Sequence, residues 1–256
     1  MEHHRLMTIR FLSVCTIAGL VPVFAYADTS QSVAGESDTW RFQVTPYVWM
    51  AGLEGHVRPV RASPTLNVDK TFSEIMDSVD AAAFLTGTAR YGRYIIHGDF
   101  SYVATSDSAS LPMNLSARAK VRQTSMTLVG GYAFPLGNAS NVDLMAGMRA
   151  WKINAKAQVA GLVSARSDTA FVDPVIAARW RYDISPKWST LLYVDVGGFG
   201  VGSDSTWQVL GTVNYQVTDS AHVSLGYREL SVDFDSKGKR LDFRQSGPLV
   251  GVTFTF

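Results

Sequence analysis

A histidine, an aspartate and a serine occupy alternate positions in one short part of the chain, as His97, Asp99 and Ser101. These are the residue types of a hydrolytic triad, in which a base activates a hydroxyl nucleophile and a carboxylate orients the base. On a β-strand, side chains two residues apart lie about 6.5–7 Å from each other along the chain. Direct hydrogen bonds of a triad do not span that distance. We therefore expect no enzyme and no catalytic residues, unless another strand supplies the serine.

Two further patterns that could bind a cofactor or a metal are incomplete. The glycine-rich run at 197–202 lacks the lysine of a phosphate-binding loop, and no helical pattern follows it. Three histidines and no cysteine follow residue 27, without the paired spacing of a metal site. We expect no cofactor and no metal, and a sharp bend at the glycine run.

The segments that carry these residues alternate between apolar and polar side chains. Between Thr206 and Val217 the alternation is regular, and a period of two residues is typical of a β-strand. Its apolar face holds Trp207, Val209, Gly211, Val213, Tyr215 and Val217. A soluble sandwich and a transmembrane barrel both produce such a pattern.

Strand length and aromatic placement favour the barrel. Sandwich strands usually have about 5–6 residues, whereas membrane-spanning strands need about 9–11, and most alternating segments here run beyond ten. Aromatic rings prefer the two boundaries between water and lipid. We expect one rim to hold Trp40, Tyr94, Tyr132, Phe134, Tyr182 and Trp188, and the other to hold Tyr102, Phe199, Trp207 and Phe243. The sequence thus predicts an all-β, closed antiparallel transmembrane β-barrel.

Ten spanning strands are the favoured count, because an even number returns both chain ends to the same side. They are expected near 40–51, 80–91, 93–105, 116–134, 141–158, 171–184, 187–201, 205–217, 221–235 and 240–256. Residues 52–57 and 65–68 could form a hairpin around Pro59 and Pro64, and twelve strands result if that hairpin spans the membrane.

The connections are expected to be short on the periplasmic side and longer outside. Thr105–Ser116 and Ala160–Ala170 are polar and are predicted to be long outer loops. Phe72–Val79 is predicted to be a short helix, because Thr71 and Glu74 match the spacing of a capping box. Such a helix must pack on the lumen wall, the barrel rim or the membrane surface. A helix at the rim is the favoured interpretation, and a plug that narrows the pore is the alternative.

The inward face of the predicted barrel carries charges of both signs. The candidates that line the lumen are Arg90, Arg93, His97, Asp99, Arg149, Arg179, Arg181, Asp183, Asp195 and Arg228. A barrel near eight strands is filled by its own side chains, and an open channel needs many more. We expect a salt-bridged interior, with a thin polar pathway for a small solute as the alternative.

The first 27 residues have the pattern of a removable secretory signal. Arg5 and Arg10 precede the apolar stretch Phe11–Val23, and Ala25-Tyr26-Ala27 provides small residues for cleavage. The expected domains are a signal peptide at 1–27, a flexible tether at 28–39 and the barrel at 40–256. The single Cys15 falls within the signal, and the net charge of +1 argues against nucleic acid as a partner.

The last residues alternate and end in phenylalanine, with Gly251, Phe254 and Phe256 spaced as in the signal read by the outer-membrane assembly machinery. Several short motifs resemble a group of largely uncharacterised proteobacterial outer-membrane β-barrel proteins, which is broadly similar to the small opacity-type barrels. They are Pro46-Tyr47-Val48-Trp49 with Gly52-Leu53-Glu54-Gly55, Asp173-Pro174, Gly197–Asp204 with Trp207, Gly226-Tyr227-Arg228 and Gly247–Gly251. The resemblance implies the outer membrane of a Gram-negative bacterium, and it implies no substrate or catalytic residue.

We therefore expect a monomeric outer-membrane barrel with a structural or narrow-channel role. The expected partners are outer-membrane lipid, lipopolysaccharide and the barrel-assembly machinery. Arg118, Lys120 and Arg122 alternate on one strand and could pair with lipopolysaccharide phosphates. The alternatives are a lipid-modifying outer-membrane enzyme and a surface ligand binder or adhesin.

Overall fold

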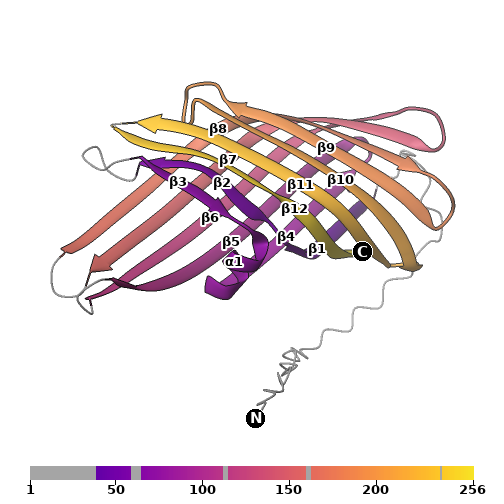
Figure 1. Ribbon diagram of the computed structural model, residues 1–256. Helices are drawn as coiled ribbons and strands as arrows, with labels where there is room; N and C mark the ends of the chain where they lie inside the picture. The colour runs from indigo at the N-terminus through magenta and orange to yellow at the C-terminus, as the bar shows by residue number, and fades with distance from the viewer. Residues whose placement is uncertain (1–38, 59–64, 112–114, 160–162, 237) are drawn as a thin grey trace, which may run out of the picture.

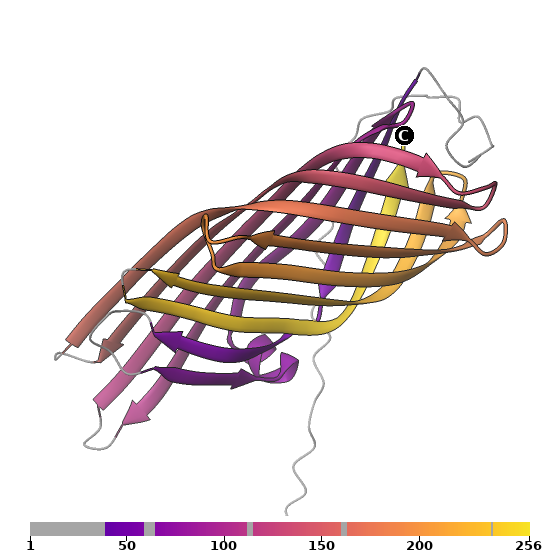
Figure 2. The same ribbon diagram turned by 90° about the horizontal axis from the view of Figure 1, so that it is seen from above.

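A computed structural model describes residues 39–58, 65–111, 115–159, 163–236 and 238–256 as an antiparallel β-barrel (Figures 1 and 2). The predicted signal peptide and most of the predicted tether lie outside these residues. The elements are β1 (Trp40–Trp49), β2 (Gly52–Arg58), β3 (Leu66–Lys70), α1 (Phe72–Ser78), β4 (Val79–Tyr91), β5 (Tyr94–Leu111), β6 (Leu115–Pro135), β7 (Ser140–Val159), β8 (Val163–Asp183), β9 (Trp188–Gly198), β10 (Ser205–Thr218), β11 (Ala221–Ser236) and β12 (Lys239–Thr255). Within the described ranges, no helix has the length and hydropathy needed to cross a membrane.

The barrel closes through β1, which pairs with β4 on one side and with β12 on the other. Each remaining strand from β4 to β12 pairs with its sequence neighbour. β2 pairs with the outer part of β12, and β3 pairs with β2. The wall thus has ten strands, as predicted, and the β2–β3 hairpin adds two strands outside the closed ring.

The outward face of the ring is apolar over the length of a membrane-spanning strand. On β1 the exposed side chains include Trp40, Phe42 and Val48, and on β9 they include Leu192, Val194 and Val196. A water-soluble monomer rarely exposes an apolar surface this large, whereas a barrel in lipid requires it. The alternation in the sequence therefore places its apolar face toward lipid.

The end of the barrel at which β1 begins and β12 ends is assigned as the periplasmic end, because an even number of strands returns both chain ends to that side. Its turns lie at 92–93, 136–139, 184–187 and 219–220, and both β1 and β12 have their terminal ends there. At the opposite, outer end β5, β6, β7 and β8 extend well past their neighbours (Figure 2).

The prediction of two long outer loops was wrong. Most of 105–116 and of 160–170 belongs to strands, because Thr105 pairs with Val121 and Ala165 pairs with Ala157 in continuous ladders. These strand extensions lie above the lipid, so their outward side chains face water. Polar side chains therefore occur on the outward face as well as on the inward face. The sequence consequently loses its apolar face there although the backbone pairing continues.

The glycine run forms the tight connection between β9 and β10. Gly198 and Gly200 adopt positive φ angles of 89° and 74°, which glycine accepts without steric cost. The Asp173 carboxylate accepts a hydrogen bond of 2.6 Å from the backbone N–H of Ser203 and so ties the turn to β8. The glycines serve a bend, as the sequence predicted.

Helix α1 begins with the predicted capping box. The Thr71 hydroxyl accepts from the Glu74 N–H, and the Glu74 carboxylate accepts from the Thr71 N–H at 2.8 Å. The helix contacts β2 and β5 and has no buried residue. It therefore packs at the barrel wall beside the β2–β3 hairpin (Figure 1) and does not plug the lumen.

The interior of the outer half is a hydrophobic core. It contains Tyr47, Trp49, Trp151, Phe171, Leu230, Val232, Phe234, Leu241, Phe243 and Leu249. Phe171 and Phe234 stack with ring centroids 4.4 Å apart. Phe243, predicted at the outer rim, is only 5% exposed and belongs to this core, because its position on β12 faces inward.

Candidate functional site: the polar interior of the barrel

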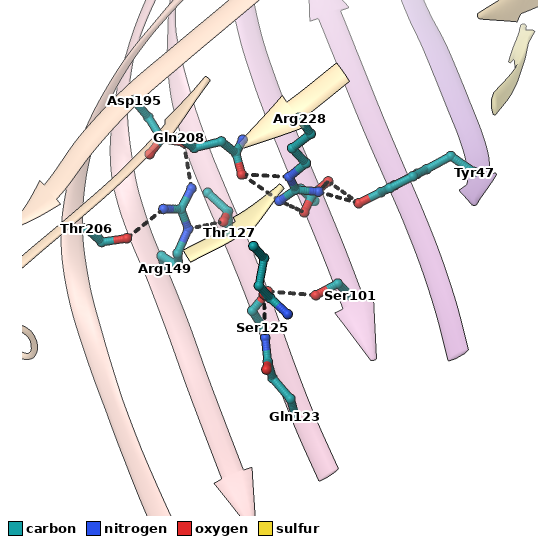
Figure 3. Close-up of polar contacts among 12 residues, drawn as sticks. Tyr47, Ser101, Gln123, Ser125, Thr127, Arg149, Asp195, Thr206, Gln208 and Arg228 are labelled. Atoms are coloured by element: carbon teal, nitrogen blue, oxygen red, sulfur yellow. Dashed lines mark hydrogen bonds and ion pairs between the residues drawn. The ribbon is translucent and has the colours of Figure 1, made fainter. Parts of the chain in front are cut away.

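Arg228 on β11 is the centre of a buried hydrogen-bonded group in the middle of the lumen (Figure 3). Its guanidinium donates to Asp99 on β5 at 3.1 Å, to Gln208 on β10 at 3.0 Å and to the Tyr47 hydroxyl on β1 at 2.6 Å. The Tyr47 hydroxyl in turn donates to Asp99 at 2.9 Å. The guanidinium carbon also lies 4.7 Å from the ring centroid of Trp49. Four strands thus converge on one charge.

A second arginine, Arg149 on β7, is fixed beside this group (Figure 3). It is 1% exposed and donates to Asp195 at 2.6 Å, to Thr127 at 2.9 Å and to Thr206 at 3.1 Å. Each of its three donor nitrogens therefore has a partner. Arg149 and Asp195 thus neutralise each other inside the lumen, where either charge would be costly to bury alone.

A third group lies nearer the periplasmic end around Asp143 on β7. This carboxylate accepts from Arg90 at 2.6 Å, from Arg179 at 2.8 Å and from Asn141 at 2.7 Å. Arg179 also donates to the Thr88 hydroxyl at 3.1 Å. The Asp143 carboxylate thus forms ion pairs with two arginines.

The periplasmic half of the lumen also contains a cavity of about 130 Å³. Its walls are mainly hydroxyl and amide side chains, together with Arg179, Arg181, Arg228 and Asp99. Arg228 and Tyr47 form its inner end, beyond which the hydrophobic core fills the lumen. The periplasmic side of the interior therefore contains a polar cavity and a smaller apolar cluster that includes Ile95, Val129 and Met145, whereas the larger hydrophobic core fills the outer side.

Nine of the ten predicted lumen candidates take part in this interior or its mouth. Asp99, Arg149, Arg179, Asp195 and Arg228 are buried in the groups above, Arg90 binds Asp143, and His97 lies against Tyr193. Arg181 and Asp183 form a half-buried ion pair of 3.0 Å at the periplasmic mouth. Arg93 belongs to the turn between β4 and β5, where its Nε is buried without a hydrogen-bond partner.

Sequence reasoning missed several members of the interior. Asp143 occupies an inward position of a regularly alternating segment and could have been identified from that alternation. Tyr47, Gln208 and Thr206 are uncharged, and nothing in their types separates them from other inward residues. Only the register of the strands brings them to the arginines.

The residues His97, Asp99 and Ser101 bond to three different partners. His97 Nδ1 lies 3.0 Å from the Thr88 hydroxyl, Asp99 binds Arg228, and the Ser101 hydroxyl lies 2.9 Å from that of Ser125. This arrangement is the one expected of a packed interior. Among the described residues, no group of three or more His, Cys, Asp or Glu could hold a metal ion.

Comparison with solved structures identifies outer-membrane barrels as similar folds. The outer membrane protease OmpT from Escherichia coli matches with a TM-score of 0.53 at 12% identity, covering 86% of this chain and 98% of that chain. The translocator domain of the autotransporter NalP from Neisseria meningitidis matches with a TM-score of 0.48 at 12% identity, covering 86% of this chain and 89% of that chain. No family model and no curated protein matches the sequence.

The closed ring of ten strands, the apolar outward band and the similarity to OmpT define the fold of the protein as that of an outer-membrane β-barrel. The resemblance seen in the sequence is confirmed at the level of this fold. At 12% identity the comparison with OmpT carries the fold and no activity.

Proposed function

We propose that this protein is a closed structural barrel of the outer membrane and that it does not conduct small solutes. The observation that carries the proposal is the hydrophobic core in the outer half of the lumen. Leu230 is 1% exposed and Val232 is 0% exposed, although both face the barrel axis. A hydrated solute would have to displace packed aromatic and aliphatic side chains and lose its hydration, which is energetically costly.

Planar-bilayer recording tests this proposal directly. Purified barrel, shown to be folded by its heat-modifiable gel mobility, is expected to produce no discrete openings over a wide voltage range. Discrete single-channel steps in the same folded preparation, absent from detergent alone, would contradict the closed barrel. They would support the narrow-channel alternative instead.

A basic surface on the outward face of β6, β7 and β8 favours an additional role in binding lipopolysaccharide. It consists of the exposed side chains Arg118, Lys120, Arg122, Lys152, Lys156 and Arg166. Lys120 lies opposite Lys156, which lies opposite Arg166 on the next strand. Arg166 is paired with Asp168 at 2.7 Å, whereas Lys120 and Lys156 form no ion pair in the described part of the chain. Like charges directly opposite each other destabilise a sheet, so the two lysines favour an anionic partner.

The height of the basic surface fits the phosphates of the outer leaflet. Met126 is an outward apolar residue of β6, and Arg122 and Lys120 precede it by four and six residues, toward the outer end of the strand. At about 3.3 Å per residue and a strand tilt of about 40°, these cations lie about 10–15 Å above that apolar side chain. Arginine and lysine bind phosphate strongly at such positions.

Binding of the detergent-solubilised barrel to vesicles tests this role. We expect binding to vesicles that contain lipopolysaccharide to exceed binding to phosphatidylcholine vesicles, and the triple substitution Arg118→Gln, Lys120→Gln and Arg122→Gln to reduce it at least about tenfold. Lys187→Gln, which removes a cation from a periplasmic turn, is the matched control and should change little. Equal binding to both vesicle types would rule out the proposed phosphate recognition.

We also propose that the barrel does not modify lipid. His97 lies inside the barrel against Thr88 and Tyr193, while acyl chains contact the outside. Mass spectrometry of lipid A from cells with and without the gene should show the same species. A modified lipid A that disappears in the His97→Ala variant would instead establish the enzyme.

A further inference from the structure

The cavity in the periplasmic half of the lumen carries an unbalanced charge. Its lining includes three arginines, Arg179, Arg181 and Arg228, and one carboxylate, Asp99. Asp99 binds Arg228 at 3.1 Å, Arg181 is paired with Asp183 at 3.0 Å, and Arg179 shares Asp143 with Arg90. One carboxylate for two guanidinium groups leaves a positive charge near Arg179.

Arg41 adds a second positive charge immediately below the cavity. It lies two residues from the lining residue Gln43 on the same inward face of β1, and it is the register partner of Arg90 on β4. In the described part of the chain Arg41 forms no ion pair, and its buried Nε has no hydrogen-bond partner. The positive charges of Arg90 and Arg181 repel the guanidinium of Arg41. The four arginines 41, 90, 179 and 181 therefore outnumber the two carboxylates bound to them, Asp143 and Asp183.

A buried histidine in the same wall also lacks a partner. His222 on β11 lines the cavity, is 9% exposed, and has a buried Nδ1 atom without a hydrogen-bond partner. Buried polar atoms are nearly always hydrogen-bonded. Two unsatisfied nitrogens, on Arg41 and His222, at one end of a polar cavity indicate that a ligand supplies the missing bonds.

We propose that this cavity is a binding site for a small oxyanion, specifically a phosphate group, reached from the periplasmic end. Guanidinium groups match the oxygens of phosphate with paired, charge-assisted hydrogen bonds. The volume of about 130 Å³ corresponds to about four water molecules and admits such an ion. The Arg181 side chain, which lines the cavity, is 32% exposed, so solvent reaches this level. The core above blocks passage to the outside, which makes the site a blind pocket.

Isothermal titration of the folded barrel with inorganic phosphate, in a phosphate-free buffer and a neutral detergent, tests the proposal. We expect saturable binding of one phosphate per barrel, weakened at least about tenfold by Arg41→Gln because one charged donor is removed. Arg118→Gln, an arginine-to-glutamine change on the outer surface, is the matched control and should alter the affinity less than about twofold. Acetate should bind more weakly than phosphate.

Several outcomes overturn the proposal. They are the absence of saturable binding to the unsubstituted barrel, an equal loss in the Arg118→Gln control, or tighter binding of acetate than of phosphate. The first titration can overturn the proposal even if Arg41→Gln does not fold, because the absence of saturable binding needs no variant to establish. The result is independent of the conductance recording, since a closed barrel with or without a phosphate site conducts nothing.

Discussion

At the scale of single residues, the stability of the interior depends on arginines whose partners come from distant strands. Arg228 is 2% exposed and its guanidinium contacts Asp99, Gln208, Tyr47 and the Trp49 ring. Replacing Arg228 by alanine leaves the Asp99 carboxylate buried without its ion-pair partner. We expect the free energy of unfolding to fall by about 3–5 kcal/mol, measured by urea unfolding of the barrel in lipid vesicles.

A double substitution separates the ion pair from the packing. Arg228→Leu with Asp99→Leu removes both charges and keeps apolar volume, and replacing a whole buried pair is often nearly neutral. We therefore expect the double variant to be more stable than Arg228→Ala. If both variants lose the same stability, the contribution of Arg228 comes from its hydrogen bonds to Gln208 and Tyr47, which both variants lack, and not from the charge of Asp99.

The sequence predicted the charged residues of this interior but not their partners. The inward positions of Arg228 and Asp99 follow from the two-residue alternation of their strands. Their mutual contact does not, because it depends on how strands that are 129 positions apart in the sequence lie across the closed ring. Arg41, which carries much of the phosphate proposal, was absent from the predicted lumen set, although it alternates with Trp40 and Phe42 on β1.

At the scale of secondary-structure elements, α1 depends on a single carboxylate at its N-terminus. Hydrogen bonds from the backbone N–H and the hydroxyl of Thr71 lower the pKa of Glu74 below its ordinary value. A lowered pKa means that this stabilisation is present above the unfolded-state pKa and is lost as the pH falls through the folded-state value. We expect the α1 amides to lose hydrogen-exchange protection in acid, after correction for the intrinsic exchange rate.

The matched control for that experiment is Glu74→Gln. Glutamine keeps a side-chain acceptor for the Thr71 N–H but cannot titrate. Protection of α1 in this variant should be lower at neutral pH and independent of pH in the acidic range. A wild-type helix whose protection does not change in acid would show that packing against β2 and β5, and not the cap, holds it.

The row of cations across β6, β7 and β8 yields a second prediction at this scale. Lys120→Glu places a carboxylate opposite Lys156 and converts a repulsive cross-strand pair into an attractive one. We expect the barrel to gain about 0.2–1 kcal/mol in lipopolysaccharide-free detergent while its binding to lipopolysaccharide vesicles weakens. Unfolding and vesicle binding are measured on the same preparation.

If these cations serve to bind lipopolysaccharide, Lys120→Glu must raise the free energy of unfolding and weaken binding to lipopolysaccharide vesicles. Lys187→Glu, the same change in an exposed periplasmic turn, should affect neither quantity. If Lys120→Glu weakens both, the lysine has a structural role that the cross-strand register does not explain.

The boundaries of the elements were predictable only where one face of a strand touches lipid. The spanning part of β10 was predicted at 205–217 and observed at Ser205–Thr218, because lipid on one side and the lumen on the other enforce the alternation. For the outer parts of β5 and β8 the sequence predicts loops, because water outside the barrel removes the contrast between an apolar and a polar face. Strand pairing there depends on hydrogen bonds between backbone groups. Every residue type except proline can form both of these bonds, so the residue types do not reveal the pairing.

At the scale of the whole molecule, the barrel combines two interiors of different character. The periplasmic half holds ion pairs and a polar cavity, and the outer half holds a hydrophobic core like that of a soluble protein. The side chains of this core come from β1, β7, β8, β11 and β12 and point into the ring, so they have no contact with acyl chains on the outside. Its own aromatic packing and the surrounding strands must hold the outer end together.

The β2–β3 hairpin and α1 are the parts of the molecule that the closed ring does not require. β1 already pairs with both β4 and β12, whereas β2 continues along β12 and supports the outer core through Leu53 and Val57. Deleting residues 52–78 and joining Ala51 to Val79 by Gly-Ser should therefore leave a folded, heat-modifiable barrel with ten strands. Its urea midpoint should fall, because the outer core loses packing on one side.

The same deletion separates two explanations of closure. If the ring is closed by β1 alone, the deleted barrel keeps the buried Trp49 in a protected environment, and acrylamide quenching of tryptophan fluorescence rises only modestly. If the hairpin is needed to bring β12 onto β1, the deleted chain does not fold in detergent at all, and no heat-modifiable band forms. The register argues for the first outcome, since five residue pairs from Gln43–Thr255 to Trp49–Leu249 join β1 to β12 without any contribution from the hairpin.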